Sequence, residues 1–101
     1  ARKSKKIIKR LKEIEEKEEI IGDVRGMGMM IGIELVKSRE GKEPAAEERE
    51  RILQYAFKKG LLLLPAGEST IRIIPPLTVS DASLDRGLDI LQEAIEKGSL
   101  T

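Results

Sequence analysis

The sequence predicts an α+β domain, a two-layer sandwich in which a small sheet of three to four strands carries helices on one face. Three observations lead to this prediction: helical spacing of apolar residues near both ends, apolar and polar alternation between them, and the order helix, strand, helix, strand, strand, helix, which forms a split βαβ unit. The 101 residues fit one such domain, which buries about 65% of its unfolded surface in one modest core.

The first segment is predicted to be a helix that ends near Glu19. Ile7, Ile8, Leu11 and Ile14 recur at the spacing of one helical face, with charged residues elsewhere. Lysine and arginine crowd the amino-terminal half of this helix and glutamate crowds the other half, whereas the helix macrodipole favours the opposite order.

This first helix also lacks a capping residue at its start, which is typical of the remaining part of a longer helix. We therefore expect residues 1–21 to continue a helix from an upstream domain. Residues 22–101 are expected to form the small domain itself.

The next element is a predicted strand, because the helix is interrupted at Gly22-Asp23 and the chain alternates from Met29 to Val36. One face of this strand, which we expect to meet the helices, consists of Met29, Ile31, Ile33 and Leu35. The other face consists of Met30, Gly32, Glu34 and Val36.

A second helix is predicted to begin with Pro44 at its first position, where a missing N–H costs nothing. Gly60 stands where a residue in the left-handed conformation would end it. Its apolar face is predicted to consist of Ile52, Leu53, Ala56 and Phe57.

A hairpin and a last helix complete the predicted fold. The hairpin joins a strand at residues 61–64 to a strand at residues 70–74 through a turn at 65–69, and Pro75-Pro76 ends the second strand. Ser80 is the predicted N-cap of the last helix, whose apolar face of Leu84, Leu88, Leu91 and Ile95 ends at Gly98.

Composition excludes several classes of function. The chain has no cysteine and no histidine, so disulfides, thiolate chemistry, the commonest metal ligand and the commonest general base are missing, and we expect no metal site. A net charge of +1 and an aromatic content of 2% disfavour a nucleic-acid partner. No apolar run approaches the roughly 20 residues of a membrane span, and no signal peptide is visible, so a cytoplasmic protein is expected.

The lack of cysteine and asparagine, together with abundant lysine, glutamate and isoleucine, is typical of hyperthermophile proteins.

The glycines of the chain do not form either of two known cofactor-binding motifs. Gly26, Gly28 and Gly32 do not fit the dinucleotide pattern, and no glycine is followed by the residues of a phosphate loop. These glycines are expected to admit a bulge or a neighbouring chain.

Arg72 is the strongest candidate for a binding residue, because it interrupts an apolar strand. If helices cover the side of Ile71 and Ile73, Arg72 projects from the open face, where its guanidinium can bind a carboxylate through two hydrogen bonds. The alternative is a solvated or salt-bridged arginine. Glu34 is predicted on the same face, where it could pair with Arg72, contact another domain or meet water.

Three segments carry a resemblance to a known family: GDVRGMGMMIGIEL at residues 22–35, GLLLL at 60–64 and IRIIPPL at 71–77. In this order and spacing they resemble the class III pyridoxal-phosphate-dependent aminotransferases, most closely the archaeal 4-aminobutyrate aminotransferase-like group. The resemblance implies that the chain is the small C-terminal domain of a fold-type I enzyme. It also implies that Arg72 binds the substrate carboxylate, and that Arg25, Gly26 and Gly28 form a structural turn near the active site.

The resemblance further implies that the parent enzyme transfers an amino group from an amino acid, such as 4-aminobutyrate or another ω-amino acid, to a 2-oxo acid. Its cofactor would be pyridoxal phosphate, held by the large domain of the same enzyme. No lysine of this chain matches the family's Schiff-base lysine, so the chain alone is expected to be inactive. We also expect a homo-oligomer, because a bare sheet face favours association.

Two alternatives remain open at this point. Some relatives of the family racemise or epimerise amino acids with the same fold and cofactor. A small α+β sandwich can also act as a stand-alone regulatory module that binds an amino acid or a partner chain on its sheet.

Overall fold

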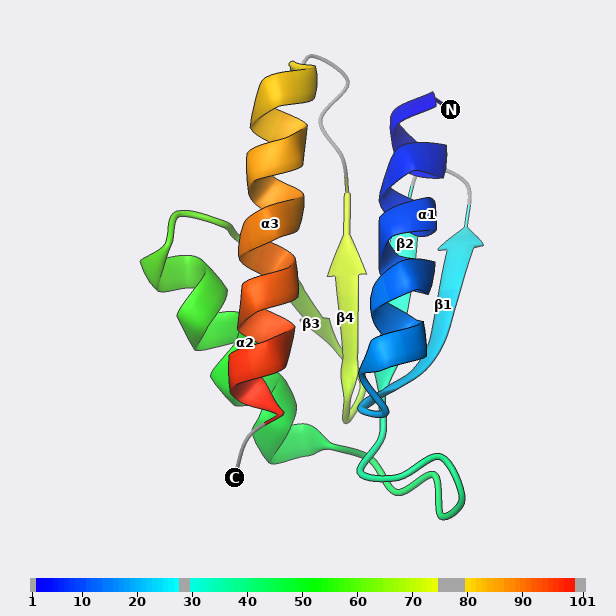
Figure 1. The fold of residues 1–101 in the computed structure, drawn as a ribbon. Helices are drawn as coiled ribbons and strands as arrows, with labels where there is room; N and C mark the ends of the chain where they lie inside the picture. The colour runs from blue at the N-terminus through cyan, green and yellow to red at the C-terminus, as the bar shows by residue number, and fades with distance from the viewer. Residues whose placement is uncertain (1, 28–29, 75–79, 100–101) are drawn as a thin grey trace.

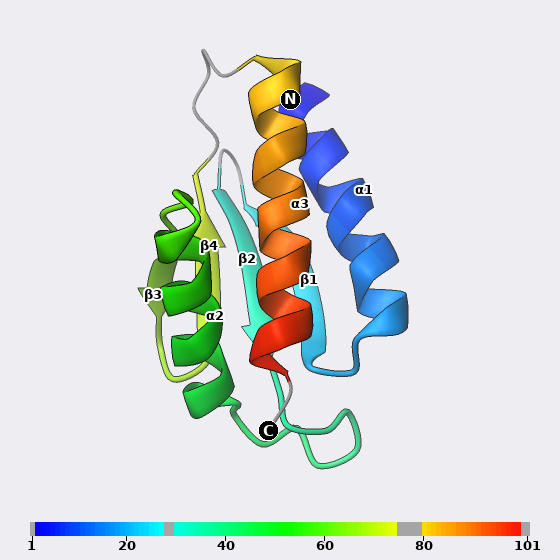
Figure 2. The same ribbon diagram turned by 60° about the vertical axis from the view of Figure 1, so that its left-hand side comes forward.

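The structure is a computed structural model that describes residues 2–27, 30–74 and 80–99. Its elements, in chain order, are α1 (Arg2–Lys17), β1 (Ile21–Met27), β2 (Met30–Leu35), α2 (Ala46–Lys58), β3 (Leu64–Ala66), β4 (Thr70–Ile73) and α3 (Asp81–Gly98). The strands form one antiparallel sheet in the order β1-β2-β4-β3, and the helices lie together against one of its faces (Figures 1 and 2). The predicted α+β sandwich is confirmed.

The core lies between the sheet and the helices and is almost entirely aliphatic. Strands β2 and β4 supply the alternating residues of the predicted inner face, and Ile31, Ile33 and Ile71 are at most 1% exposed. Because successive strand residues point to opposite faces, the intervening residues must lie on the open face. The helices contribute Ile7, Leu11, Ile14, Ile52, Ala56, Leu84, Leu88, Leu91, Ala94 and Ile95.

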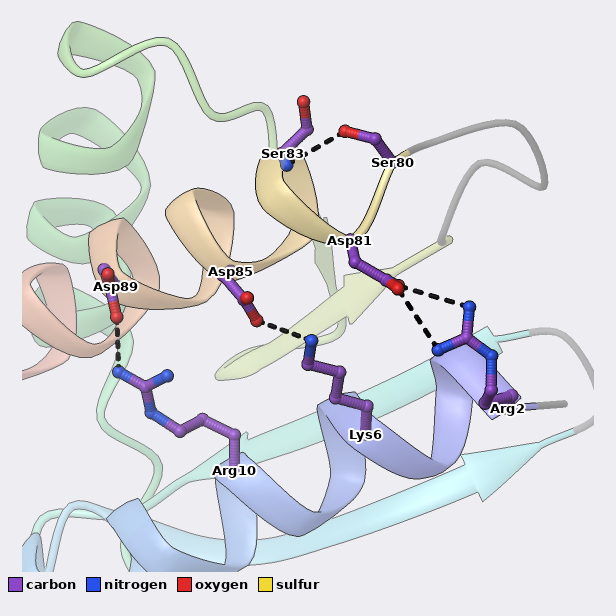
Figure 3. A network of polar contacts seen from close by, with 8 residues as sticks. All are labelled: Arg2, Lys6, Arg10, Ser80, Asp81, Ser83, Asp85 and Asp89. Atoms are coloured by element: carbon purple, nitrogen blue, oxygen red, sulfur yellow. Dashed lines mark hydrogen bonds and ion pairs between the residues drawn. The ribbon is translucent and has the colours of Figure 1, made fainter.

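Helices α1 and α3 run parallel and are joined by a ladder of three ion pairs, which Figure 3 shows from close by. Lys6 Nζ lies 2.7 Å from Asp85 Oδ1, between the pairs Arg2–Asp81 and Arg10–Asp89. The hydrogen bond from Arg2 lowers the pKa of Asp81. This ladder explains the charge order of α1, because its basic half lies beside the aspartates of α3 and these offset the unfavourable macrodipole.

The first difference from the sequence-based expectation is a strand that the pattern did not reveal. Residues 21–27 form β1, which pairs with β2 from Ile21↔Leu35 to Met27↔Met30, with an irregularity in register between Ile21 and Asp23. Gly22 lies at this irregularity. Two glycines and a charged pair interrupt the apolar alternation of β1, so its strand character comes from pairing with β2 rather than from its own pattern.

The hairpin was predicted correctly, but its first strand lies further along the chain. Strand β3 is Leu64–Ala66 and includes Pro65, which pairs with Ile71. Proline is tolerated there because β3 is an edge strand, and Leu63 is buried while Leu62 is 72% exposed. Four identical leucines have no period, so only the pairing with β4 decides which of them enters the strand.

The boundaries of α2 also differ from the prediction. Pro44 precedes the helix and forms an isolated bridge with Val36, while Ala45 is the N-cap. Ile52 and Ala56 are buried as expected, but Phe57 is 69% exposed. Gly60 has a φ of +92°, in agreement with the predicted left-handed position. Ser80 caps α3 by accepting a hydrogen bond from the Ser83 N–H at 3.1 Å, as its sequence indicates.

Candidate functional site

The open face of the sheet, opposite the helices, is where three of the predicted site residues lie: Arg25, Glu34 and Arg72. The strand register places them in two rows that run across all four strands. From β1 to β3, the first row is Arg25, Gly32, Arg72 and Leu64, and the second row is Asp23, Glu34, Thr70 and Ala66. Sequence reasoning placed Arg72 and Glu34 on one face, and both are exposed there.

The Arg72 guanidinium is exposed on the open face of the sheet. It lies on β4 between the buried Ile71 and the half-buried Ile73, so its side chain leaves the sheet on the side away from the core. In the described part of the chain, the Arg72 side chain makes no hydrogen bond and no ion pair. Its partner on β2 is Gly32, which has no side chain to obstruct a ligand. Such an arginine can bind a carboxylate through two parallel hydrogen bonds.

A cluster of charged side chains lies beside Arg72 on the neighbouring strands. Arg25 Nε donates a hydrogen bond to Asp23 Oδ2, and Arg25 Nη2 lies 3.9 Å from Glu34 Oε2. The hydrogen bond from Arg25 lowers the pKa of Asp23, and the same contact raises the pKa of Arg25. Glu34 was considered as a partner of Arg72 from the sequence, but the structure pairs it with Arg25.

Sequence reasoning missed this cluster because it did not assign β1. The spacing Asp23-x-Arg25 puts both side chains on one face of a strand, which is the signal that could have revealed it. A shallow cavity of about 100 Å³ is lined by Asp23, Arg25, Gly32, Glu34 and Thr70. A cavity of this size can hold a small polar group, such as one carboxylate or ammonium, rather than a whole substrate.

One glycine of the hairpin formed by β1 and β2, Gly26, has a structural role. A Cβ on Gly26 would lie 2.9 Å from Ile8 Cδ1, so the tip of the Ile8 side chain would have to shift for a larger residue, and glycine admits the close approach of α1 to β1. The segment that packs closely against Gly26 is therefore α1 of the same chain. Gly28 lies outside the described residues.

The open face does not fit the binding of pyridoxal phosphate by this chain alone. None of the four strands contains a lysine that could form a Schiff base. The first turns of α2 and α3 contain glutamate or aspartate, which disfavour a phosphate at these helix starts. Within the described ranges, no group of three or more histidine, cysteine, aspartate or glutamate residues could hold a metal ion.

No helix within the described ranges has the length and apolarity needed to cross a bilayer. Among the residues that the structure describes on the open face, Arg72 is an exposed arginine whose guanidinium makes no hydrogen bond or ion pair, beside the cluster of Asp23, Arg25 and Glu34.

Comparison with known proteins establishes the family. Residues 1–95 match the model of the family described as aminotransferase class-III, and the chain belongs to this family. It is 47% identical over 88 residues to the leucine/methionine racemase of Thermococcus litoralis, covering 87% of this chain and 20% of that protein. It is 43% identical over 91 residues to the 4-aminobutyrate aminotransferase of Mycobacterium leprae, covering 88% of this chain and 20% of the relative.

A solved structure with the same fold is the PMP-bound aminotransferase of Vibrio fluvialis. It superposes with a TM-score of 0.81 at 32% identity and covers 92% of this chain and 21% of its own. The chain thus spans about a fifth of the length of the relatives that it matches. The predicted family is confirmed.

Proposed function

We propose that this chain forms part of a pyridoxal-phosphate-dependent aminotransferase that moves an amino group from an amino acid, 4-aminobutyrate or another ω-amino acid, to a 2-oxo acid. The family match and the 4-aminobutyrate aminotransferase relative support this proposal. The cofactor, when bound by the rest of the enzyme, supplies an electron sink for the amino-group transfer. Residues 22–101 act as the small domain, and within residues 1–21 the helix α1, which ends at Lys17, continues a helix from the large domain.

Within that enzyme, the part that we assign to this chain is binding and orientation of the substrate carboxylate by Arg72. The observation that carries this assignment is the exposed guanidinium beside Gly32 on the open face, which has no partner among the described residues. A carboxylate held in two hydrogen bonds is fixed in both position and plane, and this orients the remainder of the substrate. The large domain would cover the open face and complete the site, and this chain alone is expected to be inactive.

The test is substitution of Arg72 in the full-length enzyme. Because a hydrogen bond to a charged group contributes about 1.5–3 kcal/mol, Arg72→Ala is expected to lower kcat/KM for the 2-oxo acid by about 10- to 100-fold. Arg72→Lys should recover only part of this loss, since lysine keeps the charge without the planar pair of donors. The absorbance of the bound cofactor should be retained in both variants.

Arg86→Ala provides the control, because Arg86 is also exposed but lies on α3, on the helical side of the sheet. Its kcat/KM should match that of the unmodified enzyme. An Arg72→Ala enzyme with unaltered kcat/KM for both substrates would remove Arg72 from the site.

A second candidate function is racemisation or epimerisation of an amino acid, which the similarity to the leucine/methionine racemase favours. The same full-length enzyme separates the two reactions. Transfer of the amino group requires an added 2-oxo acid, whereas racemisation proceeds without one and is followed as loss of optical activity.

A further inference from the structure

Glu34 lies within reach of two arginines on opposite sides of it. Both Arg25 on β1 and Arg72 on β4 are direct partners of Gly32 on β2, and Glu34 is two residues along β2 on the same face. Each arginine is therefore a diagonal neighbour of Glu34, at about 7–8 Å between backbone positions, a separation that long side chains can bridge. Glu34 is a potential partner for either guanidinium.

The structure shows Glu34 on the Arg25 side. Arg25 Nη2 is 3.9 Å from Glu34 Oε2, while Arg25 Nε is held by Asp23. Asp23 and Glu34 are themselves partners across β1 and β2, so the guanidinium also separates two neighbouring carboxylates. Removal of Arg25 would leave both carboxylates without a counter-ion on β1. Arg39 and Lys42 line a cavity together with Asp23 and Glu34, and Arg72 is the guanidinium on the neighbouring strand β4.

A Glu34 carboxylate bound to Arg72 would compete directly with a substrate carboxylate, because both need the same donors. We propose that Arg25, fixed by Asp23, is a positioning residue that keeps Glu34 away from Arg72 and so leaves Arg72 open to its ligand. This inference rests on the proposed function of Arg72. It adds a specificity device within the chain: the carboxylate affinity of Arg72 depends on which arginine Glu34 contacts.

The experiment uses the full-length enzyme and the variants Arg25→Gln, Glu34→Gln and Arg25→Gln/Glu34→Gln. Two quantities are measured: KM and kcat for the 2-oxo acid, and the Kd of glutarate, a dicarboxylate, by titration calorimetry. Arg25→Gln should raise both KM and Kd by about three- to tenfold with little change in kcat, as a competing ion pair at contact distance predicts. Glu34→Gln should slightly tighten binding.

The decisive result is the double variant. Once Glu34 is neutral, the loss of Arg25 no longer matters, so Arg25→Gln/Glu34→Gln should return KM and Kd to values near those of Glu34→Gln. If Arg25 only stabilised the fold, the added Glu34→Gln substitution would not restore KM and Kd. Arg86→Gln, which removes the same charge from the helical side, is the control and should leave both quantities unaltered.

Each remaining outcome contradicts a distinct statement. If Arg72→Ala weakens glutarate binding but Arg25→Gln does not, the positioning part of Arg25 is wrong and the proposed function of Arg72 stands. If Arg25→Gln weakens glutarate binding and the added Glu34→Gln substitution does not restore it, Glu34 does not compete with the ligand for Arg72, and the proposal is wrong. If Arg72→Ala leaves Kd and KM unaltered, the proposed function itself fails. Should Arg25→Gln not fold, Arg25→Lys keeps a charge beside Glu34 and must give a smaller rise in Kd than Arg25→Ala.

Discussion

At the scale of single residues, two glycines of α3 meet opposite surroundings. A Cβ on Gly98 would lie 2.3 Å from Ile52 Cγ1 and 3.2 Å from the Ile52 backbone N, so a side chain there collides with α2. A Cβ on Gly87 would lie 3.7 Å from Leu61 Cδ1, which is an ordinary van der Waals contact. Gly98 therefore sets how closely α3 and α2 approach, whereas Gly87 does not.

We predict that Gly98→Ala lowers the free energy of unfolding of the chain by about 1–3 kcal/mol, because α3 must shift away from α2. Gly87→Ala, the matched change in the same helix, should raise it by up to about 1 kcal/mol, since alanine favours a helix. Urea unfolding followed by circular dichroism measures both. Equal effects of the two substitutions would contradict the close packing at Gly98.

At the scale of elements, the ladder between α1 and α3 fixes the first helix of the chain to the last. Its three pairs have side chains that are between 29% and 70% exposed. Exposed pairs each contribute only about 0.2–1 kcal/mol, so the buried face of α1 contributes more to its attachment than the ladder does. The ladder mainly sets the direction of α1, because only a parallel arrangement puts Arg2, Lys6 and Arg10 each beside an aspartate of α3.

A double-mutant cycle tests this pairing. Lys6→Gln and Asp85→Asn should show a coupling energy of about 0.2–1 kcal/mol in thermal or urea unfolding. The coupling should fall towards zero in 1 M salt, where charges are screened over about 3 Å. Lys6→Gln with Asp89→Asn is the control, since these residues are not partners, and equal coupling in the two cycles would contradict the ladder.

At the scale of the whole molecule, the helices cover one face of the sheet and leave the other without a layer (Figure 2). That face carries Arg72, the charged cluster of Asp23, Arg25 and Glu34, and Leu64, which is 41% exposed. In the proposed full-length enzyme the large domain would lie against it. In the isolated chain this face is open to a second copy.

We therefore expect the isolated chain to form dimers or larger assemblies through the open face, because helices cover only the opposite face and a second copy can pack on the open one. Multi-angle light scattering at increasing concentration should show this, and Leu64→Ser should shift the mass towards the monomer. Phe57→Ser, which removes a larger exposed side chain on the helical side, should have no such effect. A monomeric mass at every concentration would contradict the expectation.

Much of the fold could be predicted because its strongest signals are periodic. The capped helix α3 was correct from Ser80 to Gly98, and the alternation of Ile31, Ile33 and Leu35 identified the inner face of β2. Strand β1 and the register of β3 were not predicted, since glycines and charges interrupt the apolar alternation of β1 and the repeated leucines before β3 carry no period. These elements owe their structure to pairing with β2 and β4.

The candidate site divides in the same way. The sequence by itself determined that Arg72 and Glu34 share the open face, because alternation along a strand is a local property. Only the tertiary structure decided that Arg25 and Asp23 join them, because the register of β1 against β2 is a contact between segments. The same holds for the charges of α1: the sequence showed an unfavourable order, and the parallel packing of α3 supplied the carboxylates that offset it.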